Sequence, residues 1–297
     1  MRRFAIFTDS CCNLTASEMV QFGIEGVVPM HFYMKGKEYD AGGEWRSVGA
    51  KEYYDAIRKG VRVSSSPARS ADYETAFREA LERSEDVLSI SCAGVLSGSL
   101  SESIAAARRL ESEFPGAVIR CVDSCTCTYP LAMLTMECAR LRDQGKTIDE
   151  VLEWIEQEKL CFNAVGTVDS LSYVKKAGRV NTSSLFLGAK PVLVNDEIGN
   201  NVVLEKARGR RGALERLAGL VAQYSRTDLR PEIYIAHGDC LEEAKLLAEM
   251  IRERIRRIMP IFRFGYVEAG AGASVGPGAL IAGFYGDPAV RTLYRKK

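Results

Sequence analysis

The chain has 297 residues, enough for two medium-sized domains, and 46% of them are apolar, which excludes a disordered protein. Lys and Arg number 40 against 39 Asp and Glu, so the net charge of +1 predicts neither a nucleic-acid partner nor a general attraction to anionic membranes. No apolar run approaches the ~20 residues of a membrane-spanning helix, and the run near the start is too short for a signal peptide. Nine scattered cysteines are typical of reduced thiols, so we expect a cytoplasmic protein.

The first half of the chain alternates short apolar runs with helical patterns, which predicts α/β layers. Strands are expected at residues 3–7, at 27–33, from 87 and at 118–122, and residues 35–46 are expected to form a turn and a loop. Capping boxes at Thr15–Glu18 and Thr147–Glu150 predict helix starts, and Gly23 predicts a helix end. Further helices are expected from residue 70, from residue 99, and over residues 131–144 and 148–159.

The pattern changes near residue 160, which we take as a domain boundary. Beyond it, strands are expected at residues 162–168, 191–194, 202–205, 233–236, 262–267 and 280–285, with helices at 171–177, 211–224 and 242–257. The short turn 196–201 predicts an antiparallel pair, and the glycine-rich residues 270–278 predict a turn that serves either a ligand or the structure alone. We therefore expect two α/β domains: residues 1–160 with a mostly parallel sheet and helices on both faces, and residues 161–297 with a mixed sheet.

A buried strand, a turn of small residues and a helix follow one another at residues 86–107. Ser97, Gly98 and Ser99 stand where the first N–H groups of the helix have no intrahelical acceptor, and the helix dipole adds positive charge at that end. Such a helix start binds anions, so this turn predicts a site for a phosphate or a carboxylate.

Two further strand ends carry short polar side chains, in Thr8-Asp9-Ser10 and in Asp123-Ser124. The carboxyl ends of parallel strands meet at one edge of a sheet, where ligands bind. Each of these residues is explained equally well as a cap of the segment that follows it. Taken jointly with the turn at Ser97, they favour a polar binding site at that edge.

Basic residues offer two more candidates. Arg179 follows the glycine that ends a short predicted helix, and its guanidinium fork suits an anion. A basic cluster in the second half is either a solvated face or a docking patch; it consists of Lys206, Arg208, Arg210 and Arg211.

Signatures of catalysis and metal binding are missing from the sequence. It contains no Walker A, H-E-x-x-H or G-x-S-x-G motif. His31 and His237 have no local nucleophile, and the cysteines at 121, 125 and 127 lack the paired spacing of a zinc site. We therefore expect no catalytic residue, no metal and no cofactor.

Short motifs spread along nearly the whole chain resemble those of the DegV family of bacterial fatty-acid-binding proteins. Their order and spacing carry the resemblance; they are Phe7-Thr8-Asp9-Ser10, Ser64-Ser65-Ser66-Pro67, Leu96-Ser97-Gly98-Ser99, Val122-Asp123-Ser124, Gly178-Arg179, Lys190-Pro191-Val192-Leu193, Glu205-Lys206-Ala207-Arg208 and Gly276-Pro277-Gly278-Ala279. The family usually has Thr-Ser-Gln-Pro at the second of these positions and Leu-Ser-Gly-Thr at the third.

The resemblance implies that one long-chain fatty acid is held between and within two α/β domains. It also implies a partner, because family members present the acyl carboxylate to a separate ATP-using subunit of fatty acid kinase and hold the acyl-phosphate product. Ser64 and Ser97 stand at the family's carboxylate-binding threonine and serine. Arg179 stands near the head-group mouth, and Ser65, Gly98 and Ser99 lie in the same motifs.

The sequence departs from the family pattern at one position that bears on function. Ser274 stands where the family has a head-group histidine, and a hydroxyl cannot supply the proton chemistry of an imidazole. Three functions therefore stay open: a lipid-binding protein that works with a kinase, a fatty-acid carrier or sensor that has lost this partnership, and an enzyme acting on a small phosphorylated substrate.

Overall fold

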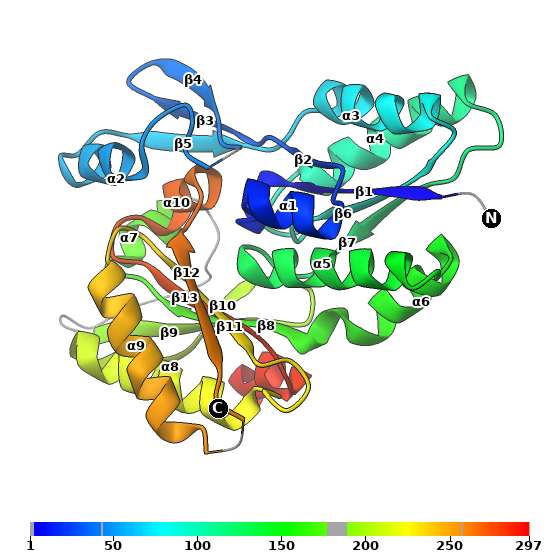
Figure 1. Ribbon diagram of the computed structural model, residues 1–297. Helices are drawn as coiled ribbons and strands as arrows, with labels where there is room; N and C mark the ends of the chain where they lie inside the picture. Colours follow the sequence, from blue (N-terminus) through cyan, green and yellow to red (C-terminus); the bar gives the residue numbers. More distant parts are fainter. Residues whose placement is uncertain (1–2, 43, 177–188, 257, 297) are drawn as a thin grey trace.

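The computed structural model describes residues 3–42, 44–176, 189–256 and 258–296, and it contains three β-sheets (Figure 1). Sheet A has the strand order β2-β1-β6-β7, sheet B the order β4-β3-β5, and sheet C the order β10-β9-β8-β13-β11-β12. The strands of sheets A and B all come from residues before 124, and those of sheet C from residues after 161. The domain boundary at residue 160 stays a prediction.

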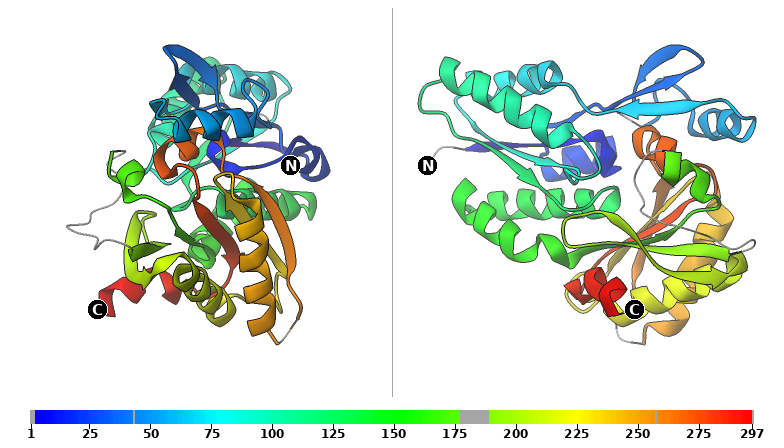
Figure 2. Two further views of the ribbon diagram at one scale, coloured as in Figure 1. Left: turned by 90° about the vertical axis from the view of Figure 1, so that its left-hand side faces the viewer. Right: turned by 180° about the vertical axis from the view of Figure 1, so that it is seen from behind.

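Sheet A is parallel throughout and is covered by helices on both faces, as the sequence predicts. Its strands are β1 (Phe4–Asp9), β2 (Gly26–Val28), β6 (Asp86–Ser91) and β7 (Ile119–Asp123). Helices α3 (Ser70–Glu82) and α4 (Ser99–Glu113) lie on one face, and α5 (Tyr129–Asp143) and α6 (Ile148–Glu158) on the other (Figures 1 and 2). Along β1 the side chains alternate between two cores: Ile6 packs in the core that holds α5, and Phe7 packs against Phe77 of α3.

The predicted local signals around sheet A are confirmed. Helix α1 (Ala16–Phe22) starts at the Thr15–Glu18 capping box and ends at Gly23, whose φ is +56°. Helix α6 starts at the second capping box, formed by Thr147 and Glu150. These caps need only neighbours in sequence, which explains why the sequence alone predicts them.

Sheet B was not predicted. It consists of β3 (His31–Met34), β4 (Lys37–Asp40) and β5 (Val63–Ser66), with α2 (Ala50–Arg58) beside it. The strand expected at 27–33 is in fact two strands in different sheets, because Pro29 between them lacks the N–H that a continuous ladder requires. The expected loop at 35–46 contains β4, joined to β3 through Lys35 and Gly36, both with positive φ as a tight hairpin turn requires.

Sheet C is mixed, as predicted, since only its β11–β12 pair is parallel. Its strands are β8 (Phe162–Thr167), β9 (Ala189–Asn195), β10 (Asn201–Arg208), β11 (Glu232–His237), β12 (Ile261–Tyr266) and β13 (Leu280–Tyr285). Ile233 and Ile235 of β11 face α8 (Gly209–Tyr224) and α9 (Leu241–Arg254), whereas Tyr234 faces α5. The described part of the chain also contains the short 3-10 helices η1 (Ser10–Cys12), η2 (Lys159–Cys161) and η3 (Pro288–Lys296).

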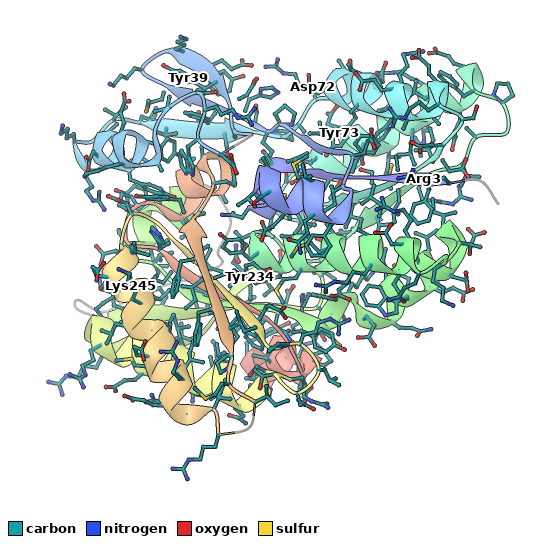
Figure 3. All side chains as sticks on the ribbon, viewed as in Figure 1. Arg3, Tyr39, Asp72, Tyr73, Tyr234 and Lys245 are labelled. Carbon is teal, nitrogen blue, oxygen red and sulfur yellow. The ribbon has the colours of Figure 1, made fainter. Side chains whose placement is uncertain are left out.

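Helix α5 lies between sheets A and C and joins their cores (Figures 1 and 3). The ring of Tyr129 at its start lies 4.8 Å from that of Tyr234 on β11, and ten residues of the helix are buried. Among the described residues, none of the helices combines the length and apolar character needed to cross a membrane.

The glycine-rich turn expected at 270–278 is instead mostly a short helix, α10 (Ala269–Val275). The buried carboxyl group of Glu268 causes this, since it accepts the N–H groups of Gly270, at 2.6 Å, and of Ala271. Gly276 ends the helix with a φ of +73°, and a Cβ atom there would lie 2.4 Å from the ring of Tyr173. Only glycine fits both requirements.

Candidate functional site: two cavities beside α7 and α10

A cavity of about 520 Å³, here called the polar cavity, lies where three elements meet. The loop after α2 and strand β5 supply Arg62, Ser64 and Ser65, helix α7 (Leu171–Lys176) supplies Ser172 and Tyr173, and α10 supplies Ser274. The structure therefore brings together three of the residues that the sequence marked, Ser64, Ser65 and Ser274.

The polar cavity suits an anion. Its described lining contains several hydroxyl groups and the Arg62 guanidinium but no Asp or Glu. Ser64 is exposed on β5 and Ser274 is 5% exposed, and neither hydroxyl has a hydrogen-bond partner within the described part of the chain. Both are thus able to donate to an incoming acceptor.

Arg62 was missed at the sequence level. Side chains alternate along extended backbone, so a residue two positions before Ser64 lies on the same side. That spacing is the signal that would have found Arg62.

A second, largely apolar cavity of about 40 Å³ is lined by the same two short helices. Tyr173 and Ser274 line the polar cavity, while their neighbours in sequence, Val174 and Val275, line the apolar cavity. Its remaining lining comes mainly from β8, β9 and β13; it includes the aliphatic residues Val165, Val168, Leu193, Val194 and Ile281 and the polar residues Thr167, Asn195 and Asn201.

The turn before α4 has the expected position, at the start of the helix, but it does not line the polar cavity. Ser97 is 8% exposed, and its Oγ accepts the N–H of Ser99 at 3.2 Å and lies 2.9 Å from the Ser99 Oγ. Ser99 Oγ in turn accepts the N–H of Ala68 at 3.4 Å. Gly98 lies against Pro67, since a Cβ atom there would come 3.2 Å from the proline Cγ.

The acidic residues at the strand ends serve as caps. Asp9 accepts the N–H groups of Cys11, at 3.1 Å, and of Cys92, at 2.8 Å, and its burial raises its pKa to about 8. Asp123 accepts the N–H groups of Gly94 and Cys125, at 3.1 and 2.8 Å. The sequence left two interpretations of these residues open, a cap of the following segment or part of a binding site, and these hydrogen bonds support the cap.

Arg179 falls outside the described residues. The other marked residues do not line the polar cavity. Arg210 pairs with Glu243 and donates to the Gly278 carbonyl at 2.6 Å, which supports a structural role within the basic cluster. His237 Nδ1 accepts the N–H of Cys240 at 3.3 Å, and burial lowers the pKa of this imidazole. Within the described ranges, no group of three or more His, Cys, Asp or Glu side chains is suited to a metal ion.

Fold and cavities together define a three-sheet α/β protein with a polar cavity of about 520 Å³ beside α10. The chain belongs to the DegV family: the family's sequence model, described as that of an uncharacterised protein, matches residues 3–286. A DegV domain-containing protein of Clostridium perfringens is 30% identical over 97% of this chain and 99% of its own length.

Solved structures share the fold. A DegV family protein from Thermus thermophilus, described as fatty-acid binding, is 26% identical, with a TM-score of 0.80 over 95% of this chain and 99% of its own. DegV from Bacillus subtilis, described as a fatty acid binding protein, is 22% identical, with a TM-score of 0.82 over 97% of this chain and 100% of its own, and this likeness concerns the fold.

Proposed function

We propose that this chain binds one long-chain fatty acid, with the carboxylate in the polar cavity and the acyl chain in the apolar cavity, and presents it to a separate kinase subunit in the cytoplasm. The observation that carries the proposal is that neighbouring residues of α7 and α10 line two cavities: one whose described lining is rich in hydroxyl groups and contains no Asp or Glu, and one lined mostly by aliphatic side chains. An amphipathic anion requires this combination. A small phosphorylated substrate would have no use for the apolar cavity.

The energetic terms support a division of tasks between the two cavities. Burying the ~14 methylenes of a sixteen-carbon chain contributes roughly 11 kcal/mol at ~0.8 kcal/mol each, from which association removes several kcal/mol. A hydrogen bond to the carboxylate contributes about 1.5–3 kcal/mol. The tail thus supplies most of the affinity, and Ser64 and Ser274 select the head group and its orientation.

The acyl chain must widen the apolar cavity. Its volume of about 40 Å³ has room for only a few water-sized groups. The walls of α7 and α10 would have to move away from sheet C as the chain enters. This need predicts that fatty acid binding stabilises an expanded arrangement of these two short helices.

Mass spectrometry of an organic-solvent extract tests the binding. We expect the purified protein to yield a stoichiometric long-chain fatty acid, and lipid-stripped protein to take up palmitate or oleate but not inorganic phosphate. Protein that carries no lipid and does not bind these fatty acids would refute the proposal. Saturable phosphate binding without lipid binding would favour the enzyme of small phosphorylated substrates instead.

A separate assay tests the kinase partnership. Lipid-loaded protein is mixed with a fatty acid kinase subunit from the same cell and ATP, and acyl phosphate is trapped with hydroxylamine. Ser274 replaces an imidazole at the head group, so the Ser274→His variant is expected to give more product than the parent protein. If neither protein supports product while both bind fatty acid, the function is that of a carrier or sensor.

A further inference from the structure

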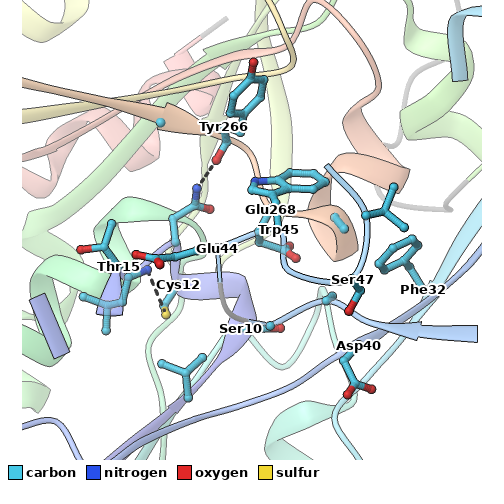
Figure 4. Close-up of a pocket in the computed structure, with 18 of the residues that line it drawn as sticks. Ser10, Cys12, Thr15, Phe32, Asp40, Glu44, Trp45, Ser47, Tyr266 and Glu268 are labelled. Carbon is cyan, nitrogen blue, oxygen red and sulfur yellow. Dashed lines mark hydrogen bonds between the residues drawn. The ribbon is translucent and has the colours of Figure 1, made fainter. Parts of the chain in front are cut away.

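A third cavity, of about 330 Å³, lies at the start of α10 and shares no lining residue with the polar cavity, which includes Ala273 and Ser274 near the end of this helix (Figure 4). Its lining comes from η1 and the start of α1, from the loop between β4 and α2, from β12 and from the start of α10. We call it the acidic cavity. The proposed function makes no use of it.

The composition of the acidic cavity is the reverse of that of the polar cavity. Its described lining includes the carboxyl groups of Asp40, Glu44 and Glu268 and no Lys, Arg or His. Five aromatic side chains also line it: Phe32, Trp45, Tyr129, Phe264 and Tyr266. Asp40 Oδ1 lies 3.1 Å from the Nδ1 of His31, and Glu44 accepts the N–H of Ala16 at 3.0 Å, which leaves Glu268 as the acid considered for a ligand. Acidic side chains and aromatic faces together attract a cation, and aromatic walls favour an ammonium group over a metal ion.

Two hydrogen-bond acceptors in this cavity retain free capacity. Glu268 is 7% exposed, and two backbone N–H groups occupy two of the roughly four lone-pair positions of its carboxylate. Asn13 donates its Nδ2 to the Tyr266 carbonyl, which fixes the orientation of the amide. Its Oδ1 is then a buried acceptor with no partner among the described residues. A buried acceptor without a partner is costly, and an ammonium N–H would satisfy it.

We propose that the acidic cavity is a second binding site, for a small organic cation in which an ammonium group is joined to an apolar or aromatic body. The ammonium group lies among Glu268, the Asn13 Oδ1 and the Trp45 face, and the apolar body lies against the other aromatic rings. Figure 4 labels both Trp45 and Glu268 among the residues that line the cavity. A fatty acid is disfavoured at this site, because the described lining offers its head group the acidic side chains of Asp40 and Glu44 and no Lys, Arg or His.

Binding of the cation is expected to release a proton. Burial raises the pKa of Glu268 well above its usual range, and a cation bound beside the carboxyl group would favour its ionised form and lower that pKa. The titratable groups that face Glu268 are Asp9, Cys11, Cys12, Tyr53 and Tyr54, all without positive charge. An ammonium ligand would supply the missing positive charge, and its affinity should therefore rise with pH.

The two tryptophans make a direct experiment possible. Only Trp45 and Trp154 occur in the chain, and Trp154 lies on α6 against Phe162. In the Trp154→Phe protein, Trp45 is therefore the sole tryptophan reporter of the cavity. The probes are 2-phenylethylammonium, its uncharged isostere 2-phenylethanol, and choline.

We expect saturable quenching of Trp45 by 2-phenylethylammonium, with at least tenfold weaker binding of 2-phenylethanol. By calorimetry, Glu268→Gln should weaken cation binding roughly 10- to 100-fold, and Trp45→Leu roughly 2- to 30-fold. Glu215→Gln, an exposed change on α8, is the charge-matched control and should leave the Kd within about twofold. Circular dichroism establishes that each variant is folded.

Three results would overturn the proposal. The first is a Kd weaker than about 1 mM for both 2-phenylethylammonium and choline. The second is equal affinity for the amine and the alcohol, which would show that no charge is recognised. The third is unchanged amine binding in folded Glu268→Gln and Trp45→Leu proteins, which would place the amine elsewhere.

Discussion

Replacement of Ser64 by alanine should separate recognition of the fatty acid head group from stability. Ser64 is exposed, and its hydroxyl has no partner among the described residues, so its loss should change the free energy of unfolding of the lipid-free protein by less than about 0.5 kcal/mol. A hydrogen bond from this hydroxyl to a carboxylate contributes about 1.5–3 kcal/mol. Ser64→Ala should therefore raise the Kd for palmitate roughly 10- to 100-fold.

The assay compares an acid with an uncharged ligand of the same chain length. Palmitate and hexadecanol are titrated against lipid-stripped protein by displacement of a fluorescent fatty acid, and thermal melting is recorded without lipid. Hydrogen bonds to a neutral hydroxyl contribute only about 0.5–1.5 kcal/mol, so the preference for the acid over the alcohol should fall about tenfold. The tail contacts are the same for both ligands.

Ser66→Ala is the matched control, because Ser66 lies on the same strand but does not line the polar cavity. It should leave both Kd values within about twofold. The reasoning is refuted if Ser66→Ala weakens palmitate binding as much as Ser64→Ala does, or if Ser64→Ala weakens acid and alcohol equally. A large drop in the melting temperature of Ser64→Ala would mean that the serine is structural.

Other variants test the surrounding structure. Ser97→Ala should cost about 0.5–2 kcal/mol of stability in chemical denaturation, since its Oγ holds a backbone N–H at the start of α4. Gly276→Ala should lower the free energy of unfolding by about 2–4 kcal/mol, because the backbone has a positive φ and the new Cβ would overlap the Tyr173 ring. Gly219→Ala, in the middle of α8 where a Cβ meets no other atom, is the control and should raise the free energy of unfolding by roughly 0.5–1 kcal/mol. Arg62→Gln should weaken palmitate binding about 1.5- to 5-fold at low salt and less at high salt. Burial raises the folded-state pKa of Glu268, so its contribution to stability is complete below the usual carboxyl pKa and is lost as pH rises from there through the folded-state pKa. Above the usual carboxyl pKa, the fall in the free energy of unfolding with pH should therefore be shallower in Glu268→Gln, by up to about 1.4 kcal/mol per pH unit; an unchanged slope would contradict this.

The parts of the fold that depend on neighbours in sequence are predictable from the residues. Thr15 and Glu18 form their capping box with each other, independently of distant residues. The continuous apolar run of β1 predicts that both faces of this strand are buried. Sheet B is different, because β4 reads Lys-Glu-Tyr-Asp and carries no apolar alternation. Its strand character comes from pairing with β3, which the local pattern does not contain.

The candidate site was predictable only in part, for a similar reason. The family resemblance located Ser64 and Ser274, yet nothing in either motif indicates that β5 and α10 border one cavity. The position of Arg62 at the polar cavity and the existence of the acidic cavity both depend on which elements, far apart in the sequence, pack together. Glu268 is the clearest example of what the sequence did not predict. Its carboxyl group caps a helix in a glycine-rich segment, where residue propensities alone predict no helix.

Helix α10 gives the two proposed ligands a way to affect each other. Its seven residues span about 10 Å, with Glu268 at the start beside the acidic cavity and Ser274 in its last turn beside the polar cavity. The hydroxyls of Tyr53 and Tyr54 bind the carbonyls of Ala269 and Val267, at 2.6 and 2.7 Å, and tether this end of the helix to α2. If the acyl chain moves α10 away from sheet C, it also moves the carboxyl group that holds the amine. Linkage requires that the amine change the fatty acid Kd by the same factor by which the fatty acid changes the amine Kd. Equal Kd values for palmitate with and without saturating amine would show that α10 does not connect the two sites.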